Sequence, residues 1–364
     1  MALVPQNVLS LEPYVPGKPI EEVEREYGVR EVAKLASNEN ALGPSPKALA
    51  AAREAAGRMH LYPDGSAFYL KEALARKFAV APEEVIVGNG SNELIELLVR
   101  TFVLEGEEVL TSAHTFIAYK LAAGAQGRKL VEAPMRDRFH YDLAALRARL
   151  SPRTKVVFLA NPDNPTGTWF LEDDLVPFLE AVPKETLVVL DEAYVEFVEA
   201  PRFQDSLSLR RRFPNLIVLR TFSKIYGLAG LRLGYGFARP ELTGYIDRVR
   251  APFNVSLVAQ AAGVAALGDE AHVERTRELV RRERPFLAER LSALGATVVP
   301  SQANFLLADF PGTSGKVLFE ALLRQGVVVR PMGGYGFPTA QRITVGTRPE
   351  NEKAIAALRK ALGR

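Results

Sequence analysis

Short apolar runs alternate with longer helical patterns through the first two thirds of the chain, and this alternation constrains the fold more than any other feature. Several runs are continuous, which is typical of parallel strands that helices cover on both faces. The pattern predicts an α/β fold with a mainly parallel seven-stranded sheet. Its predicted strands are Val85–Val87, Val109–Thr111, Lys129–Glu132, Val156–Ala160, Leu187–Leu190, Ile217–Arg220 and Leu233–Phe237, the last of which we expect to be antiparallel.

The pattern changes after about residue 255. A long charged helical stretch, Glu270–Leu294, is followed by short strands and by a helical segment at Lys316–Gln325. This order predicts a second, smaller α+β domain. We therefore expect an N-terminal arm at 1–40, a large domain at 41–255 and a small C-terminal domain at 256–364. The Pro-rich arm is expected to pack against the small domain or a partner subunit. The predicted strands of the small domain are Thr297–Val299, Asn304–Ala308, Val327–Val329 and Ile343–Val345.

Composition removes several classes of function. The 364 residues are 48% hydrophobic and 24% charged, as in a soluble globular protein. The absence of Cys excludes disulfides and thiolate chemistry and fits a cytoplasmic protein. A net charge of +3 without a basic tail does not favour nucleic-acid binding, and no uninterrupted apolar run is long enough for a membrane helix. The four His residues lack metal-ligand spacing, so we expect no metal site.

A lysine lies in a confined position after the apolar run that ends at Leu219. The stretch reads T221-F-S-K-I-Y-G-L-A-G-L-R232, and it places Lys224 in a turn of small and hydroxyl residues. A lysine held in this way can form a Schiff base with a carbonyl cofactor. Ser223 and Arg232 would then bind a phosphate on the same cofactor. This combination indicates pyridoxal 5'-phosphate (PLP), although Ser-Lys pairs also occur on ordinary surfaces.

A glycine-rich turn precedes the predicted helix Asn92–Val103. It reads V87-G-N-G-S-N-E, and its glycines allow a tight turn at a helix N-terminus that can bind phosphate. Gly90, Ser91 and Asn92 would contact that phosphate. A dinucleotide fingerprint does not fit, because Glu93 occupies the place of the third glycine. A capped turn without a ligand is the alternative.

Polar residues follow two further predicted strands. Asn164 lies in N161-P-D-N-P-T-G167, where it can point into a site at the carboxyl ends of the strands. Asp191 follows three apolar residues, and a buried acid needs a cationic partner such as the pyridinium nitrogen of PLP. Tyr194 could hydrogen-bond the ring oxygen. A structural salt bridge or a metal-binding acid is the alternative for Asp191. Phe116 could stack on the cofactor ring, and a core aromatic is the alternative.

Together these motifs resemble the fold-type I PLP-dependent aminotransferases, and the resemblance covers nearly the whole chain. More narrowly, the sequence resembles the histidinol-phosphate aminotransferases, a class II-like group of this family. The strings that carry this resemblance are LASNENALGPSP, LYPDGS, NPDNPTG, DEAYVEF, FSKIYGLAGLRLGY, RAPFNVSLVAQ, VVVRPMGGYG and QRITVGT.

The resemblance implies a role for each candidate residue. Lys224 would bind the cofactor covalently and shuttle a proton, with Asp191 and Tyr194 as the other catalytic residues. Tyr62 would reach the phosphate from the other subunit of a homodimer. The remaining cofactor-binding residues would be Gly90, Ser91, Asn92, Phe116, Asn164, Thr221, Ser223 and Arg232. Substrate would bind to Tyr14, Asn38, Arg330 and Arg342. The implied substrates are L-histidinol phosphate and glutamate or 2-oxoglutarate.

Two departures from the family pattern concern loop shape. Ala41 replaces the usual Pro after N-E-N, and His114 replaces a common Pro before Thr115. Several alternatives stay open. A decarboxylase of phosphothreonine type or an aminotransferase for aromatic or acidic amino acids would share the same motifs. A PLP-sensing regulator would need a fused DNA-binding segment, and the Pro-rich arm does not resemble one. The broken glycine fingerprint makes a nicotinamide dehydrogenase a poor fit.

Overall fold

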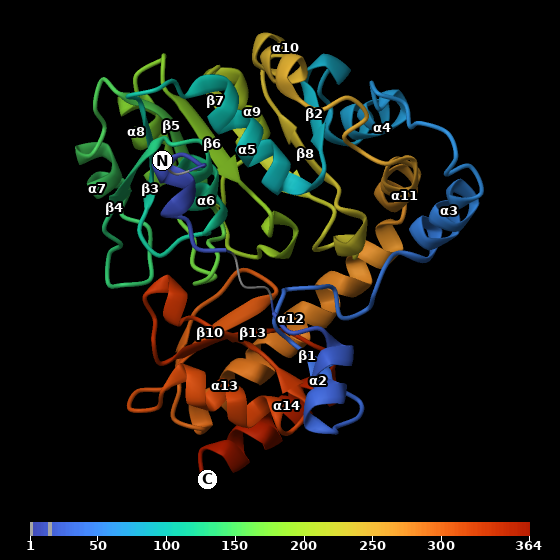
Figure 1. The fold of residues 1–364 in the computed structure, drawn as a ribbon, viewed down its shortest axis with the longest axis vertical. Coiled ribbons are helices and arrows are strands. Elements are labelled where there is room, and N and C mark those ends of the chain that lie inside the picture. The colour runs from blue at the N-terminus through green and yellow to red at the C-terminus, as the bar shows by residue number, and fades with distance from the viewer. Residues whose placement is uncertain (1–2, 14–16) are drawn as a thin grey trace.

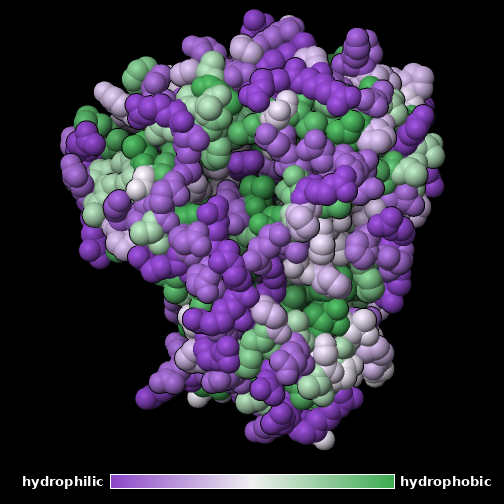
Figure 2. All heavy atoms as spheres, turned by 180° about the vertical axis from the view of Figure 1, so that it is seen from behind, coloured by the Kyte–Doolittle hydropathy of each residue, from purple (hydrophilic) through white to green (hydrophobic). Residues whose placement is uncertain are grey.

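A computed structural model describes residues 3–13 and 17–364. It has an upper body built on a large sheet and a lower body built on a smaller one, with the long helix α12 (Glu270–Ala293) running between them (Figure 1). None of the helices in these described residues has the length and apolar character needed to span a membrane. The face in Figure 2 is mainly hydrophilic, with apolar patches near its middle.

The large sheet has the predicted number of seven strands, and they lie in the order β2-β8-β7-β6-β5-β3-β4. β8 is antiparallel to both of its neighbours, β2 and β7, and the other pairs are parallel. The mainly parallel α/β fold and the antiparallel strand are therefore confirmed. The strands are β2 (Val85–Gly88), β3 (Glu108–Ser112), β4 (Lys129–Ala133), β5 (Thr154–Ala160), β6 (Leu187–Asp191), β7 (Leu216–Thr221) and β8 (Gly234–Phe237).

Helices cover both faces of this sheet, which explains the continuous apolar runs. Along β5, Val156 and Phe158 pack into one buried cluster with α5, α6 and α10, whereas Val157 and Leu159 pack into another with α7, α8 and α9. Successive strand residues point to opposite faces, so a strand covered twice needs apolar residues throughout. The helices are α5 (Gly90–Phe102), α6 (Ala118–Ala125), α7 (Leu143–Ala148), α8 (Glu172–Ala181), α9 (Ser206–Arg212) and α10 (Pro240–Val249).

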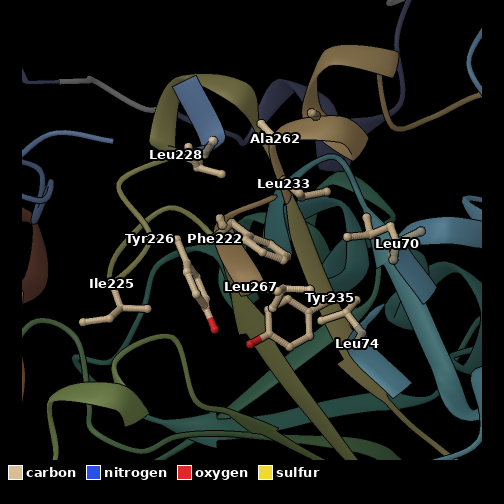
Figure 3. Packing of buried hydrophobic residues seen from close by; sticks show 14 of the residues in the cluster. Leu70, Leu74, Phe222, Ile225, Tyr226, Leu228, Leu233, Tyr235, Ala262 and Leu267 are labelled. Atoms are coloured by element: carbon tan, nitrogen blue, oxygen red, sulfur yellow. The ribbon is translucent and has the colours of Figure 1, made fainter. Parts of the chain in front are cut away.

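A third buried cluster joins the β2–β8–β7 end of the sheet to α12 and to three further helices. Figure 3 shows Phe222 and Tyr235 packed with Leu70 and Leu74 of α4 (Phe68–Phe78) and with Ala262 of α11 (Leu257–Leu267). This packing holds the segment after β7 in place. The third of these helices is α3 (Pro46–Ala56), and short 3-10 turns are η1 (Pro82–Glu84), η2 (Val195–Phe197), η3 (Ala229–Leu231) and η4 (Gly333–Tyr335).

The lower body contains a four-stranded antiparallel sheet in the order β12-β13-β10-β9. Two predicted strands are displaced, because their pairing sets their ends: β10 covers Phe305–Asp309, and β13 covers Ala340–Thr344. The predicted strand at 327–329 lies outside this sheet. The other elements are β9 (Thr297–Val299), β11 (Val327–Val328), β12 (Arg330–Pro331), α13 (Gly315–Leu323) and α14 (Arg348–Ala361).

The N-terminal segment lies against both bodies. α1 (Gln6–Leu9) lies beside α6, where Asn7 donates to the Gly124 carbonyl over 3.1 Å. α2 (Ile20–Tyr27) and β1 (Ala33–Lys34) join the lower body, and β1 pairs in parallel with β11. The predicted domain limits stay predictions; α11, which falls just after residue 255, packs against the helices α3 and α4 of the upper body.

Candidate active site

The motif residues meet at one edge of the large sheet, where β2, β3, β5, β6 and β7 all have their carboxyl ends. A cavity of about 270 Å³ opens there, between the sheet edge, the N-terminal segment and the lower body. Ligand sites in open α/β sheets lie at this edge. The predicted residues that line the cavity are Asn38, Ser91, Asn92, Phe116, Asn164, Asp191, Tyr194, Thr221, Ser223, Lys224, Arg232, Arg330 and Arg342.

Lys224 extends from the turn after β7 into this cavity and is half-buried. Its Nζ donates to the Ser37 carbonyl oxygen over 2.9 Å. Burial, reinforced by the positive charges of Arg342 and Arg232, lowers the pKa of Lys224 to about 7. A large fraction of the amine is therefore uncharged near neutral pH, which is the form that attacks a carbonyl carbon.

Asp191 is the last residue of β6 and is buried. Its Oδ2 accepts from the Tyr119 hydroxyl over 2.9 Å, whereas Oδ1 is buried without a hydrogen-bond partner among the described residues. Burial raises the pKa of Asp191 to about 6, against the opposing effect of the Tyr119 hydrogen bond. An incompletely hydrogen-bonded buried carboxylate beside a cavity indicates a site for a cationic group.

Tyr194 is held by the N-terminal segment. Its Oη accepts from Nδ2 of Asn38 over 3.0 Å, and Thr344 of β13 donates to Oδ1 of the same Asn38 over 3.2 Å. Burial raises the pKa of Tyr194 to about 12, although the Arg342 charge opposes the shift. The phenol is therefore protonated at neutral pH and can donate a hydrogen bond into the cavity.

The turn at the start of α5 lies tightly against Arg232. Gly90 has φ +79°, and a Cβ there would lie 2.5 Å from Nη2 of Arg232. A Cβ at Gly234 would lie 2.3 Å from the Ser91 nitrogen. Both positions therefore require glycine. The result is a guanidinium beside a helix N-terminus, where free backbone amides and the helix dipole favour an anion such as phosphate.

Two hydroxyl residues continue this anion-binding side. Thr221 ends β7, and Ser223 follows in the turn, where its backbone nitrogen donates to Oγ1 of Thr221 over 3.1 Å. Both side chains are buried at the cavity wall. Phe116 forms another part of the wall and meets the ring of Tyr119 edge-on at 5.7 Å.

Arg342 connects the lower body to the loop after β5. Its Nη1 donates to Oδ1 of Asn164 over 2.5 Å and its Nη2 to the Ala36 carbonyl over 2.7 Å. On the neighbouring strand, Arg330 lies directly opposite Arg342 in the antiparallel ladder. Like charges in this relation repel each other. Two arginines facing one cavity therefore favour an anionic ligand between them.

Two predicted residues do not line the cavity, and a third is not among the described residues. Gly90 supports the cavity from behind, packed on Arg232, and does not line it. Tyr62 is 82% exposed and stacks on Phe253 at 4.8 Å in a shallow surface hollow away from the cavity. Tyr14 lies outside the residues that the structure describes. The roles of Tyr62 and Tyr14 stay predictions.

Some residues of the site do not appear in the sequence-based prediction. The Ser37 carbonyl contacts Lys224, Tyr119 contacts Asp191, and Glu39 and Tyr335 line the cavity. The contact of the Ser37 carbonyl could not be predicted from the sequence, because every residue type has a backbone carbonyl. Tyr119 resembles an ordinary core aromatic on α6, and its contact spans 72 positions of sequence. Only Glu39 had a signal, because it is the acid of the N-E-N string.

The fold and this cavity define a PLP-dependent aminotransferase of fold type I. The family model of class I and II aminotransferases matches residues 30–358. The chain belongs to this family, and the resemblance predicted from the motifs is confirmed.

Curated relatives match along the full chain. The histidinol-phosphate aminotransferase of Anaeromyxobacter sp. (strain Fw109-5) is 74% identical over 363 residues, which cover 100% of both chains. That of Moorella thermoacetica is 50% identical and is matched over 98% of this chain and 92% of its own length.

Solved structures agree with this assignment. The histidinol-phosphate aminotransferase of Sinorhizobium meliloti in complex with pyridoxal-5'-phosphate superimposes with a TM-score of 0.91 at 32% identity, covering 100% of this chain and 98% of that one. An aspartate aminotransferase variant of Thermus thermophilus gives a TM-score of 0.85 at 25% identity, covering 99% and 100%.

Proposed function

We propose that this protein transfers an amino group between L-histidinol phosphate and 2-oxoglutarate, giving imidazole-acetol phosphate and glutamate, as a step of histidine biosynthesis. The pairing of Arg330 with Arg342 at a cavity that also contains Lys224 carries the proposal. Both substrates bear an anion, a phosphate in one case and carboxylates in the other. The planar guanidinium fork of arginine pairs bidentately with either group.

The residues of the cavity fit PLP. The buried Oδ1 of Asp191 can accept from a protonated pyridine nitrogen, and Tyr194 can donate to the ring oxygen. Arg232, beside the start of α5, can hold the phosphate together with Ser91 and Ser223. When bound, PLP supplies an electron sink that stabilises negative charge at the Cα atom of the substrate.

Lys224 has two tasks in this proposal. Its uncharged amine provides the covalent link to the cofactor. With cofactor and substrate bound, the same Nζ would take the proton from the substrate Cα and deliver it to C4′ of the cofactor. A group with a pKa near 7 serves as both base and acid at neutral pH.

We further propose that the active unit is a cytoplasmic homodimer. Tyr62 and Phe253 stack on each other in a surface hollow that Met59 and Leu61 also line, and all four side chains are exposed. Exposed apolar surfaces of this kind often mark subunit contacts. In a dimer, Tyr62 of the partner subunit would reach the cofactor phosphate of this chain.

An absorbance titration tests the proposed reaction. Purified protein would be loaded with PLP and treated first with L-histidinol phosphate and then with 2-oxoglutarate, while glutamate is measured. We expect the visible cofactor band to disappear and then return as glutamate forms. If the band does not change with L-histidinol phosphate but does change with an aromatic amino acid, the protein is a PLP-dependent aminotransferase with a different substrate. Release of carbon dioxide from phosphothreonine, with no need for a keto acid, would indicate a decarboxylase.

A further inference from the structure

Tyr119 occupies a fully buried position on α6, directly behind Asp191. Its ring lies parallel to that of Phe158 on β5, with centroids 4.6 Å apart and planes 6° apart. This stacking fixes the direction of the hydroxyl, which donates to Oδ2 of Asp191 over 2.9 Å. Neither Tyr119 nor Phe158 lines the cavity, so direct substrate contact does not explain this arrangement.

The two oxygens of Asp191 have different surroundings. Oδ2 accepts from the rigid Tyr119 hydroxyl, whereas Oδ1 is buried without a hydrogen-bond partner in the part of the chain that the structure describes. The backbone amide of Ala193 also acts on this carboxylate and lowers its pKa. Without Tyr119 the carboxylate would keep the Ala193 backbone amide but lose its side-chain donor, and it could rotate more freely about its Cβ–Cγ bond, because this terminal torsion has a broad energy profile. The hydrogen bond therefore selects which oxygen remains available to a ligand.

We propose that Tyr119 is a positioning residue for the cofactor, which fixes the Asp191 carboxylate so that Oδ1 meets the pyridine nitrogen of PLP. The inference deepens the proposed function and rests on Asp191 facing that nitrogen. Tyr119 also helps to keep the carboxylate charged, because its hydrogen bond opposes the burial that raises the pKa of Asp191 to about 6.

Few other titratable groups influence this pair. Glu192 follows Asp191 and is neutralised by Arg220 of β7, with 2.8 Å between Oε2 and Nη2. Tyr194 lies on the cavity side, and Tyr141 and Asp163 lie near the Tyr119 hydroxyl. Burial beside these acids raises the pKa of Tyr119 well above its ordinary range, so the phenol stays a donor.

The test measures PLP affinity of the cofactor-free protein, not turnover. The variants are Tyr119→Phe and, as a matched control, Tyr235→Phe. Tyr235 is equally buried within the cluster of Figure 3, and its hydroxyl has no hydrogen-bond partner among the described residues. Dissociation constants would be determined by PLP absorbance between about pH 5.5 and about pH 8, on both sides of the pKa of Asp191.

We expect Tyr119→Phe to weaken PLP binding roughly 10-fold at neutral pH, because a hydrogen bond to a charged group is lost. Affinity should decrease as the pH falls and Asp191 becomes protonated, and in Tyr119→Phe this decrease should begin about one pH unit higher. Tyr235→Phe should remain within about twofold of the parent.

Introducing Tyr119→Phe into Asp191→Ala separates positioning from general packing. If Tyr119 acts through Asp191, adding Tyr119→Phe to Asp191→Ala should raise the dissociation constant for PLP by less than about twofold. An equal loss in both backgrounds, or a Tyr119→Phe variant that behaves like Tyr235→Phe, would overturn the inference. Failure of the parent protein to bind PLP would instead overturn the proposed function.

Discussion

The cofactor side and the substrate side of the cavity are built differently. On the cofactor side, Asp191, Thr221 and Lys224 follow directly from the ends of neighbouring strands of one sheet. On the substrate side, Arg342 comes from the lower body and Asn38 from the N-terminal segment, and hydrogen bonds between residues 178 and 306 positions apart hold them together. The first side is set by local folding, and the second requires three distant segments to pack correctly.

This difference suggests a division of labour. The strand ends lie in a buried sheet, where small displacements are costly. The substrate side depends on contacts between bodies, which can be altered with little effect on the sheet. We therefore expect substitutions on the cofactor side to reduce the turnover number and substitutions on the substrate side mainly to raise KM.

Replacement of Lys224 should have the largest effect. In Lys224→Ala, both the covalent link and the proton carrier are lost, so we expect turnover to fall by at least about 10³-fold. PLP should still bind, because the phosphate-binding residues and Asp191 are unchanged. Steady-state rates and PLP retention after gel filtration measure the two effects, and near-normal turnover would refute the role of Lys224.

Replacement of Asp191 should have the next largest effect. Asp191→Ala removes the partner proposed for the pyridine nitrogen, so we expect proton transfer at the substrate Cα to slow by about 10²-fold. Single-turnover rates of the half-reaction with glutamate would measure this step directly. An unchanged rate with saturating PLP would exclude an electronic role for the carboxylate.

The same comparison explains what could be predicted from the sequence. Lys224, Asp191 and Asn164 were predictable because each follows an apolar run that had to be a buried strand, and the carboxyl ends of parallel strands meet at one edge. The seven strands were predictable for the same reason. The two-residue strands β1 and β12 were not, since their pairing comes from distant segments. The contacts of Tyr119 and Tyr335 depend on packing that no local pattern encodes.

Substitutions of Arg342 and Arg330 test whether the substrate side of the cavity binds the anionic groups of both substrates. Arg342→Ala should raise KM for both L-histidinol phosphate and glutamate by roughly 10- to 100-fold, because a bidentate charged contact is lost. Arg342→Lys keeps the charge without the planar fork and should recover only part of the affinity. Arg330→Ala should affect mainly the phosphate-bearing substrate. A response of only one substrate to Arg342→Ala would contradict the shared anion site.

Asp191 should also reduce the stability of the cofactor-free protein. Its pKa of about 6 in the folded state exceeds the ordinary value of 3.8, so the folded state binds the proton more tightly and loses stability as the pH rises from about 4 to about 6. Above this window, Asp191→Asn should increase the free energy of unfolding by about 1–3 kcal/mol, and below it the gain should disappear. Urea denaturation at both ends of the window measures the difference.

Asp163 provides the contrast for that measurement. It is also buried with a pKa raised to about 6 by burial, but its carboxylate accepts from the hydroxyls of Thr115 and Thr166. Asp163→Asn would place an amide where these donors need acceptors, so it should destabilise the protein. If both substitutions stabilised the protein equally, burial alone would explain the effect and the Oδ1 atom of Asp191 would have no special role.

The smallest predicted effect concerns a contact between the two bodies. His114 follows β3 at φ +61°, its Nδ1 donates to the Tyr335 carbonyl over 2.7 Å, and a Cβ at Gly336 would lie 2.5 Å from that nitrogen. Proline, which is common in the family at this position, cannot adopt this φ. The loop therefore has a different shape here, and its His114 contacts the turn that carries Tyr335.

His114→Gly keeps the backbone conformation but loses the donor, and we expect it to raise KM about fivefold with kcat almost unchanged. His114→Asn should restore the parent KM, because Asn tolerates positive φ and places an amide donor near the position of Nδ1. Equal KM values for the two variants would show that the contact does not position Tyr335. A fall in kcat instead of a rise in KM would show that the two sides of the cavity are coupled more tightly than their construction suggests.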